Sequence, residues 1–178
     1  MKVSGEVVKE KANTFPLDDF AMTDIAPTVT GRRTLAIASG GGHWKQLLRL
    51  GSVLDRYDTT YVTTINGLPQ EAGVSDFRII EDCNRNDRMS VVRVAFSILV
   101  LILTVRPHVI ISTGAAPGLI AIALGRMMFV RTLWIDSIAN GDELSMSGRI
   151  ARRMAHQTLS QWQNVANTSR VGYWGQLL

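Results

Sequence analysis

The stretch LAIASGGGHWKQLLRL, from Leu35 to Leu50, decides the fold of this chain. It begins with an apolar run, continues through three glycines and a histidine, and ends in a charged, helix-like segment. This order is typical of a β-strand that ends in a glycine loop from which a helix starts. Because the first turn of such a helix presents free backbone N–H groups, we expect the loop to face an anion.

The same alternation continues along the rest of the chain. We predict strands over residues 34–39, 59–64, 77–82, 108–114, 131–137, 157–162 and 171–175. We predict helices over residues 44–55, 88–105, 117–128 and 147–156. This pattern predicts an α/β fold with a Rossmann-like, doubly wound parallel sheet over residues 34–178. Residues 1–33 mix charges with Thr and Pro and show no sustained apolar period, so we expect a loosely ordered leader.

Composition narrows the class of protein. The 178 residues are 46% hydrophobic and 19% charged, which is typical of one globular domain. The net charge of +4 arises mainly after Ser147, where arginines occur and no acidic residue does. Such a patch suits phosphates, anionic lipid headgroups or an acidic partner, or it is simply a solvated helix face. Basic and aromatic residues do not interleave there, so we do not expect a nucleic-acid partner.

Two further features of the sequence favour a reducing environment without export from the cell. Cys83 is the single cysteine, so an internal disulfide is excluded. The first residues carry acidic side chains where a secretory signal needs an apolar core. We therefore expect a reducing, cytosolic setting or the inner face of a membrane.

Three polar loops follow predicted strands, at Ser39–His43, Ser112–Gly118 and Asp136–Gly148. In a doubly wound sheet these loops gather beyond the carboxyl ends of the strands, where ligands bind. The glycines fit neither the dinucleotide fingerprint nor the P-loop, so we expect neither NAD nor a Walker-type Mg²⁺ site. No group of residues has metal-ligand spacing, and we expect no metal.

His43 and Asp136 are the candidates for acid–base chemistry. His43 lies in the first turn of the predicted helix, where the helix dipole favours neutral imidazole, the form that accepts a proton. The alternative is a histidine that only caps the helix or packs on Trp44. Asp136 ends the apolar strand RTLWIDS, so we expect its carboxylate at the rim of the crevice, whereas Asp142 and Glu143 lie in the following loop.

The helix predicted after Arg88 is unusually apolar: MSVVRVAFSILVLILTV fills the chain between Arg88 and Arg106. It is shorter than the roughly 20 apolar residues of a transmembrane helix and contains Arg93, so we do not expect a full span. One face can cover the sheet, and the other is expected to meet lipid or another protein, unless both faces pack within the domain. The basic last fifth of the chain favours a membrane surface.

Taken together, the motifs resemble a known family. The segments SGGGH, RPHVIISTGAAPG, LWIDSIANGDELSMSGRIARRMA, SQW and VGYWG occur in the order found in the acceptor-side subunit of bipartite GT-B glycosyltransferases. This family includes the PssD-type proteins of bacterial exopolysaccharide synthesis and the membrane-anchoring subunit of the dolichol-pathway UDP-N-acetylglucosamine transferase. The resemblance runs from Thr34 to the C-terminus.

The resemblance implies that the chain is the N-terminal half of a GT-B glycosyltransferase, similar to that half of MurG. A separate donor-side subunit would bind the nucleotide-sugar, so this chain is expected to need no cofactor. The acceptor would be a polyprenyl-diphosphate-linked sugar at the cytosolic face of the membrane. The chain departs from the family in two features: a polar leader stands where the eukaryotic relative has a membrane anchor, which implies peripheral attachment, and the loop has one additional glycine.

The resemblance also assigns roles to residues. His43 would be catalytic or would orient the acceptor, Asp136 would be catalytic, and Tyr173 and Trp174 would contact the donor-side subunit. The acceptor and its diphosphate would be bound by Ser39, Gly40, Gly41, Gly42, Ser112, Thr113, Gly114, Ser137 and Asn140. Two other functions stay open: a non-catalytic anchor that recruits the donor-side enzyme, and a regulatory nucleotide-binding Rossmann module.

Overall fold

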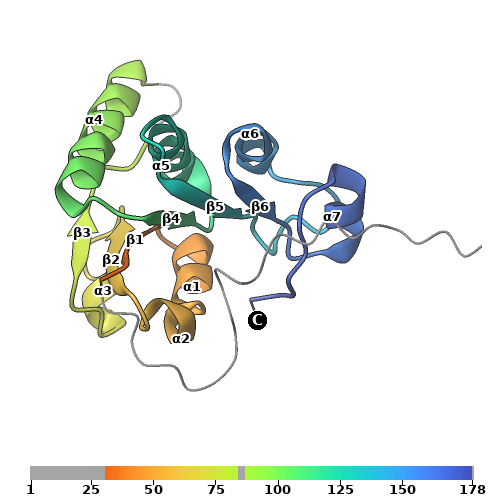
Figure 1. Cartoon of the computed structure of the whole chain (residues 1–178), viewed down its shortest axis with the longest axis horizontal. Coiled ribbons are helices and arrows are strands. Elements are labelled where there is room, and N and C mark those ends of the chain that lie inside the picture. The colour runs from red at the N-terminus through yellow and green to blue at the C-terminus, as the bar shows by residue number, and fades with distance from the viewer. Residues whose placement is uncertain (1–30, 84–86, 178) are drawn as a thin grey trace, which may run out of the picture.

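The described chain folds around a single parallel sheet. The computed structural model describes residues 31–83 and 87–177, so all but the last three residues of the predicted leader lie outside it. Six strands pair in the order β3-β2-β1-β4-β5-β6, and each neighbouring pair is parallel. Helices lie on both faces of the sheet (Figure 1). The α/β, Rossmann-like prediction is confirmed.

The strands are β1 (Arg33–Ile37), β2 (Asp58–Thr63), β3 (Phe77–Ile79), β4 (Val109–Ser112), β5 (Arg131–Ile135) and β6 (Gln157–Leu159). The helices are α1 (Gly42–Leu48), α2 (Gly51–Leu54), α3 (Leu68–Glu71), α4 (Arg88–Val105), α5 (Ala115–Met127), α6 (Met146–Met154) and α7 (Gln163–Ser169).

The strand order reverses between β1 and β4. The chain moves outward from β1 to β3, crosses back through α4, and then moves outward again from β4 to β6. The carboxyl ends of β1 and β4 are therefore neighbours at a topological switch point, the place where doubly wound sheets bind ligands. The glycine loop follows β1, and the second predicted loop follows β4.

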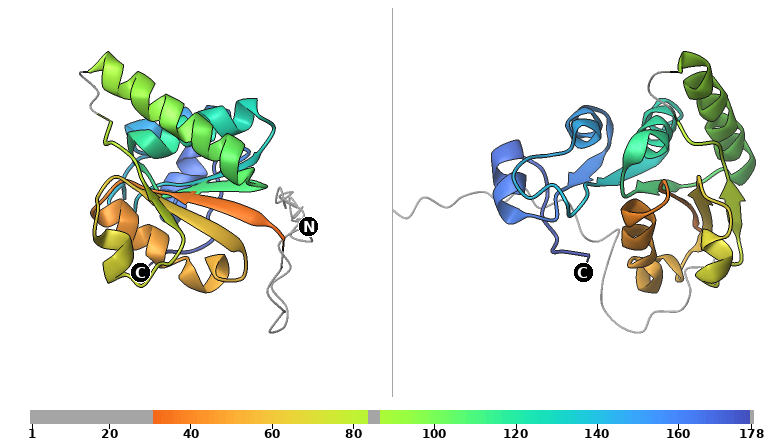
Figure 2. Two further views of the ribbon diagram at one scale, coloured as in Figure 1. Left: turned by 90° about the vertical axis from the view of Figure 1, so that its left-hand side faces the viewer. Right: turned by 180° about the vertical axis from the view of Figure 1, so that it is seen from behind.

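Both faces of the sheet are buried under helices. The layer formed by α4, α5 and α6 covers one face, and α1, α2 and α3 cover the other (Figures 1 and 2). Leu35 and Ile37 of β1 belong to the core cluster that includes Ile98 of α4, whereas Ala36 belongs to the cluster that includes Trp44 of α1. Successive side chains of a strand point to opposite faces, so a strand covered on both sides is apolar throughout.

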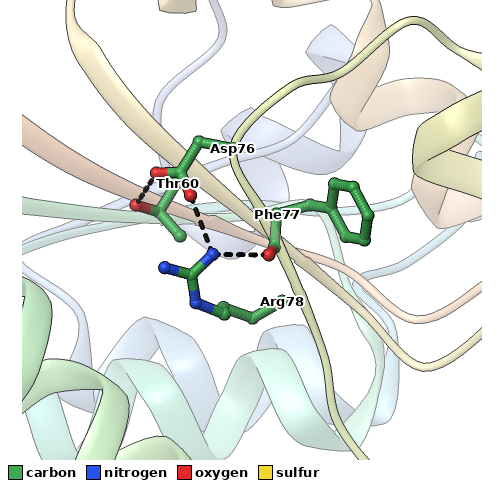
Figure 3. Close-up of polar contacts among 4 residues, drawn as sticks. All are labelled: Thr60, Asp76, Phe77 and Arg78. Carbon is green, nitrogen blue, oxygen red and sulfur yellow. Dashed lines mark hydrogen bonds and ion pairs between the residues drawn. The ribbon is translucent and has the colours of Figure 1, made fainter.

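The edge strand β3 is short and is fixed by a polar cluster. The Asp76 carboxylate accepts hydrogen bonds from the Thr60 hydroxyl at 2.6 Å and from the Arg78 guanidinium at 2.8 Å (Figure 3). The same guanidinium donates to the carbonyl of Phe77 at 2.7 Å. The Thr60–Asp76 hydrogen bond ties the beginning of β3 to β2, and the Arg78 contacts are local to β3.

The structure corrects several predicted boundaries. The helix predicted over 44–55 begins at Gly42 and is divided into α1 and α2, and the sequence did not predict the short helices α3 and α7. Residues 171–175 form no strand, because only Gly172 makes a bridge, to Leu159, and the chain then turns at Gly175 with φ 100°. The boundaries of α4 agree with the prediction.

Candidate functional site

His43 and the loop after β4 form the centre of the site. The Nδ1 atom of His43 lies 3.0 Å from the carbonyl oxygen of Thr113, and the Thr113 hydroxyl donates to the carbonyl of His43 at 2.8 Å. A carbonyl oxygen only accepts hydrogen bonds, so Nδ1 carries the proton of this contact. In the neutral ring, Nε2 is then the nitrogen with a free lone pair. The local geometry thus selects the tautomer that accepts a proton at Nε2.

Gly114 makes this contact between the two loops possible. A Cβ atom at position 114 would overlap Nδ1 of His43, and the residue has φ 141°, which L side chains rarely adopt. Gly114 is also the N-cap residue of α5. A glycine is therefore required where the second loop passes directly beside the imidazole.

The glycine loop itself leaves its backbone accessible. Gly41 and Gly42 are exposed, and nothing lies within 4 Å of a Cβ placed at either position. Gly41 has φ 67° and is the N-cap residue of α1, the helix that carries His43. Gly40 packs on Ile65, and Ser39 is half-buried. A ligand can approach the backbone of this loop more closely than it could approach larger residues.

Ser112 and Thr113 do not line the crevice as the sequence suggested. Both are fully buried. The Ser112 hydroxyl accepts from the backbone N–H of Gly114 at 3.2 Å and lies against Gly118, where a Cβ would overlap it. The Thr113 hydroxyl is bonded to the carbonyl of His43. These two side chains shape the loops, since the close packing of α5 on the sheet leaves their hydroxyl groups no path to solvent.

Asp136 is also buried, although we expected its carboxylate at the rim. It is 2% exposed, and its carboxylate accepts from Trp134 Nε1 at 3.1 Å, from the Ser145 N–H at 2.7 Å and from the Ser145 hydroxyl at 2.6 Å. The Ser145 hydroxyl in turn accepts from the Gly148 N–H at 2.8 Å and caps α6. Asp136 therefore fixes the start of α6, because the loop folds back over it.

Other acidic side chains of this loop face solvent. Asp142 and Glu143 are exposed, and Glu143 forms an ion pair with Arg149 at 3.0 Å. In the part of the chain that the structure describes, no three His, Cys, Asp or Glu side chains are grouped as metal ligands.

Of the two remaining loop candidates, only Asn140 retains an accessible side chain. Ser137 is 8% exposed, and its hydroxyl accepts from the Gln46 amide at 3.2 Å and from the Ala139 N–H at 3.3 Å. Asn140 is half-buried and closes a turn through its N–H, which donates to the carbonyl of Ser137 at 3.0 Å.

The sequence analysis missed a buried pair of amides. Gln46 and Gln161 are 7% and 1% exposed, and Gln161 Nε2 donates to Gln46 Oε1 at 2.5 Å. The only local signal was Gln46 itself, a polar residue between Trp44 and Leu47 on a helix that covers the sheet. The pair links α1 to the end of β6, which the sequence does not place side by side.

Tyr173 and Trp174 are exposed by 39% and 52%. They lie on the C-terminal segment, which we define as residues 171–177, next to the edge strand β6. Their exposed rings are available to a partner.

A comparison with protein families now adds to this geometry. Residues 74–177, more than half of the chain, match the family model described as oligosaccharide biosynthesis protein Alg14 like. The chain belongs to the Alg14-like family. The matched residues include the loops after β4 and β5, with Gly114, Asp136 and Trp174. The glycine loop and His43 precede the matched region.

Solved structures share the fold of this Alg14-like chain. MurG of Acinetobacter baumannii is 13% identical, with a TM-score of 0.63 over 75% of this chain and 43% of its own. The UDP-GlcNAc 2-epimerase of Methanocaldococcus jannaschii is 8% identical, with a TM-score of 0.61 over 78% of this chain and 42% of its own. A putative UDP-N-acetylglucosamine 2-epimerase of Listeria monocytogenes is 10% identical, with a TM-score of 0.64 over 78% and 41%.

These likenesses concern the fold, which is the Rossmann-like α/β fold found in GT-B proteins such as MurG. The chain spans less than half of the length of each of these structures. No curated protein matches the chain.

Proposed function

We propose that this chain is the acceptor-binding, membrane-associated subunit of a two-chain glycosyltransferase. The reaction would move a sugar from a nucleotide-sugar to a polyprenyl-diphosphate-linked acceptor in polysaccharide biosynthesis. The Alg14-like family and the fold shared with MurG support a glycosyltransferase-related role. The quoted motifs favour the PssD-type bacterial members within this proposal.

The observation that carries the proposal is the tautomer of His43 at the switch point. Thr113 holds the proton on Nδ1, which leaves Nε2 to accept a proton, and the exposed residues Gly41 and Gly42 directly precede His43 in the chain. The acceptor hydroxyl would give its proton to Nε2 while its oxygen forms a bond to the anomeric carbon. The bond from that carbon to the nucleotide diphosphate breaks, and the diphosphate leaves with the partner. Asp136 serves as a positioning residue, because its carboxylate is engaged by Ser145.

The glycine loop supplies the complementary part of acceptor binding. Its exposed residues Gly41 and Gly42 would let the diphosphate of the acceptor approach the backbone, and Asn140 is a half-buried residue of the loop after β5. The nucleotide-sugar would lie on the donor-side subunit, which docks on Tyr173 and Trp174. The chain would then bring no cofactor of its own to the reaction.

The outer face of α4 supports attachment to a membrane surface. This helix is long and apolar enough to cross a membrane, but Val94, Ile98 and Ile102 pack its inner face on the sheet. Its outward residues are exposed and apolar: Met89, Val92, Phe96, Val100 and Leu103. A helix that presents such a face while its opposite side covers a core is suited to lying in the membrane interface. We place this interface at the cytosolic face.

Sugar transfer in liposomes tests the proposal. Polyprenyl-diphosphate-linked GlcNAc is the acceptor probe and UDP-GlcNAc the donor probe, with this chain alone, a co-purified candidate donor-side subunit alone, and both together. Transfer only by the mixture supports the two-chain enzyme. In detergent no membrane concentrates the candidate subunit. If the candidate subunit alone then transfers sugar as fast as the mixture does, this chain takes no part in the chemistry.

A second function is favoured by one observation. The side chains of Ser112, Thr113 and Asp136 are engaged within the fold, as expected of a purely structural scaffold. Such a scaffold would only recruit the donor-side enzyme to the membrane. Under that function a His43 variant keeps full transfer, whereas loss of Trp174 or of the α4 face abolishes it.

A further inference from the structure

The C-terminal segment is attached to the fold at two separated points. At its start, Gly172 donates to the carbonyl of Thr158 at 2.9 Å and accepts from the N–H of Ser160 at 2.9 Å. At its end, the N–H of Leu177 donates to Gln161 Oε1 at 2.8 Å. The residues between these points, including Tyr173 and Trp174, are exposed. A partner that contacts the exposed part therefore acts on a segment whose end is bonded inside the core.

Gln161 connects the C-terminal segment to α1 through hydrogen bonds. Its side chain is 1% exposed, and its Nε2 donates both to the carbonyl of Asp136 at 2.9 Å and to Gln46 Oε1. Its Oε1 is the atom that accepts from Leu177. If the Leu177 N–H leaves, a buried oxygen loses its partner, which costs the desolvation penalty of that group. The amide then gains by turning or moving, and its bond to Gln46 is disturbed.

Gln46 completes the connection to the glycine loop. Its Oε1 also accepts from the Ile138 N–H at 3.1 Å, and its Nε2 donates to the Ser137 hydroxyl and to the carbonyl of Gly42, each at 3.2 Å. Gly42 immediately precedes His43. Three successive hydrogen bonds thus lead from Leu177 through Gln161 and Gln46 to the residue beside the imidazole.

We propose that Gln46 and Gln161 are positioning residues that make the geometry of the His43 loop depend on the C-terminal segment. This proposal rests on the proposed function and names the route by which a docked donor-side subunit affects the acceptor side. Docking on Tyr173 and Trp174 holds the segment in place, Leu177 stays bonded to Gln161, and the amide pair keeps Gly42 and His43 in position. Release of the segment loosens the loop.

The direct test is amide hydrogen exchange on the isolated 178-residue chain. The Lys45 N–H, which donates to the carbonyl of Gly41 at 3.1 Å, reports on the start of α1. Gln161→Met removes the amide oxygen and the amide nitrogen at nearly constant volume, and deletion of residues 177–178 removes the Leu177 donor without altering the core sequence. Each change should speed exchange at Lys45 by about tenfold, as expected for one disrupted buried hydrogen bond. Gln163→Met, on the exposed start of α7, is the matched control and should have no effect.

A double variant that combines Gln161→Met with the deletion distinguishes coupling through Gln161 from a general loosening of the fold. If the segment acts through Gln161, the double variant exchanges at Lys45 no faster than the faster single variant. The proposal is overturned if the effects of the two changes on the exchange rate of Lys45 multiply in the double variant. It is also overturned if the deletion leaves that rate unchanged. If Gln161→Met does not fold, the deletion alone decides, because its effect at Lys45 must exceed its effect on the strand amides of β1 and β4.

A kinetic measurement distinguishes this proposal from the function on which it rests. In the liposome assay Gln161→Met should lower kcat by about tenfold and leave the KM for UDP-GlcNAc unchanged, because the donor is held by the other subunit. An altered KM with an unaltered kcat contradicts a positioning role. If the wild-type pair transfers no sugar, the proposed function is wrong. If the pair is active but the exchange rate of the Lys45 amide does not change in the variants, only the coupling is wrong.

Discussion

At the scale of single residues, the state of His43 is set by one carbonyl. Thr113 accepts from Nδ1, so the lone pair of the neutral ring is on Nε2. His43→Ala should lower kcat/KM of the reconstituted pair by about 10²- to 10⁴-fold, the usual contribution of one acid–base group. The measurement is sugar transfer in liposomes, with membrane binding and subunit association measured alongside.

A companion variant tests the geometry without altering the imidazole. Gly114→Ala introduces a Cβ that overlaps Nδ1 of His43, so the ring must leave its place. Gly73→Ala also puts a side chain at positive φ but meets no atom within 4 Å, which makes it the control. If Gly114→Ala retained full activity, or lost no more than Gly73→Ala, the assignment of His43 as the base would fail.

His156 gives the fold a pH dependence far from this site. Its Nδ1 accepts from the N–H of Thr132 at 3.2 Å. Burial lowers the pKa of His156 below its usual 6.5, and the positive charges of Arg126 and Arg131 lower it further. The unfolded chain therefore binds a proton at higher pH than the folded chain does.

The sign of the effect follows from this difference. The contribution of His156 to the free energy of unfolding is fully present above about pH 6.5 and is lost as the pH falls from there toward the lower folded pKa. Urea denaturation at pH 7.5 and below 6 should show this loss, and His156→Gln should reduce the difference between the two conditions. An identical difference in wild type and variant would assign the pH dependence to other groups.

Sequence reasoning reached the loops but not the direction of each side chain. It located His43, Gly114 and Asp136 at strand ends, because strand and loop patterns are local. It missed the burial of Asp136, since Ser145, nine residues later, folds back over the carboxylate. The Gln46–Gln161 pair spans 115 positions, and a polar residue at position 46 does not indicate which distant residue it meets.

At the scale of elements, the close packing of α5 on the sheet depends on two glycines. A Cβ at Gly118 would overlap the hydroxyl of Ser112, which is fully buried on β4. A Cβ at Gly125 would lie 2.5 Å from Cδ1 of Ile110, the flexible end of a side chain. The loss of stability caused by an added Cβ depends on whether the side chain that it meets can move.

Gly118→Ala should therefore lower the free energy of unfolding by about 1–3 kcal/mol, and Gly125→Ala by less. Urea denaturation of the two variants, followed by tryptophan fluorescence, measures both values. Equal costs at the two positions would mean that Ser112 yields as readily as Ile110, and that α5 is not fixed by this contact.

The elements themselves were predictable to different degrees. The boundaries of α4 follow from local signals: the Asp87 side chain accepts from the N–H of Met89 at 2.9 Å, and Arg106 ends the helix in the left-handed conformation. The segment VGYWG was predicted as a strand because it is apolar and aromatic. Beside Leu159 it makes one bridge and then turns at Gly175, so its pairing depends on the position of the edge strand and not on its own residues alone.

At the scale of the whole molecule, the described chain forms one Rossmann-like unit with its candidate site at the switch point of the sheet. The fold aligns with less than half of MurG and of the epimerases, and the switch point carries the exposed glycine loop at its rim. Sequence patterns predicted the layers of this fold well, because each strand and helix is marked locally. They did not predict what covers the outer surfaces, since an apolar helix face has the same sequence pattern whether lipid or protein covers it.

The exposed apolar residues of α4 and of the end of α5 can be tested together for binding to a membrane. Helices α4 and α5 lie side by side on one face of the sheet (Figures 1 and 2), and exposed apolar residues also occur at the end of α5. There Met127 is 74% exposed and Phe129 is 95% exposed. Arg126 and Arg131 flank them, an arrangement suited to anionic headgroups around inserted apolar side chains.

Phe129→Ser and Phe96→Ser should each weaken binding to vesicles of phosphatidylethanolamine and phosphatidylglycerol by about ten- to a hundred-fold, the value of burying one phenylalanine. Replacing Arg126 by Gln should weaken binding less, and mainly at low salt, because the attraction of an exposed charge to headgroups is screened. Trp174→Ser is the matched control: it removes an exposed aromatic ring from the C-terminal segment and should leave vesicle binding intact while weakening subunit association. Equal loss of vesicle binding in Trp174→Ser and Phe129→Ser would place the membrane contact elsewhere, and the outer face of α4 would then be the surface that meets protein.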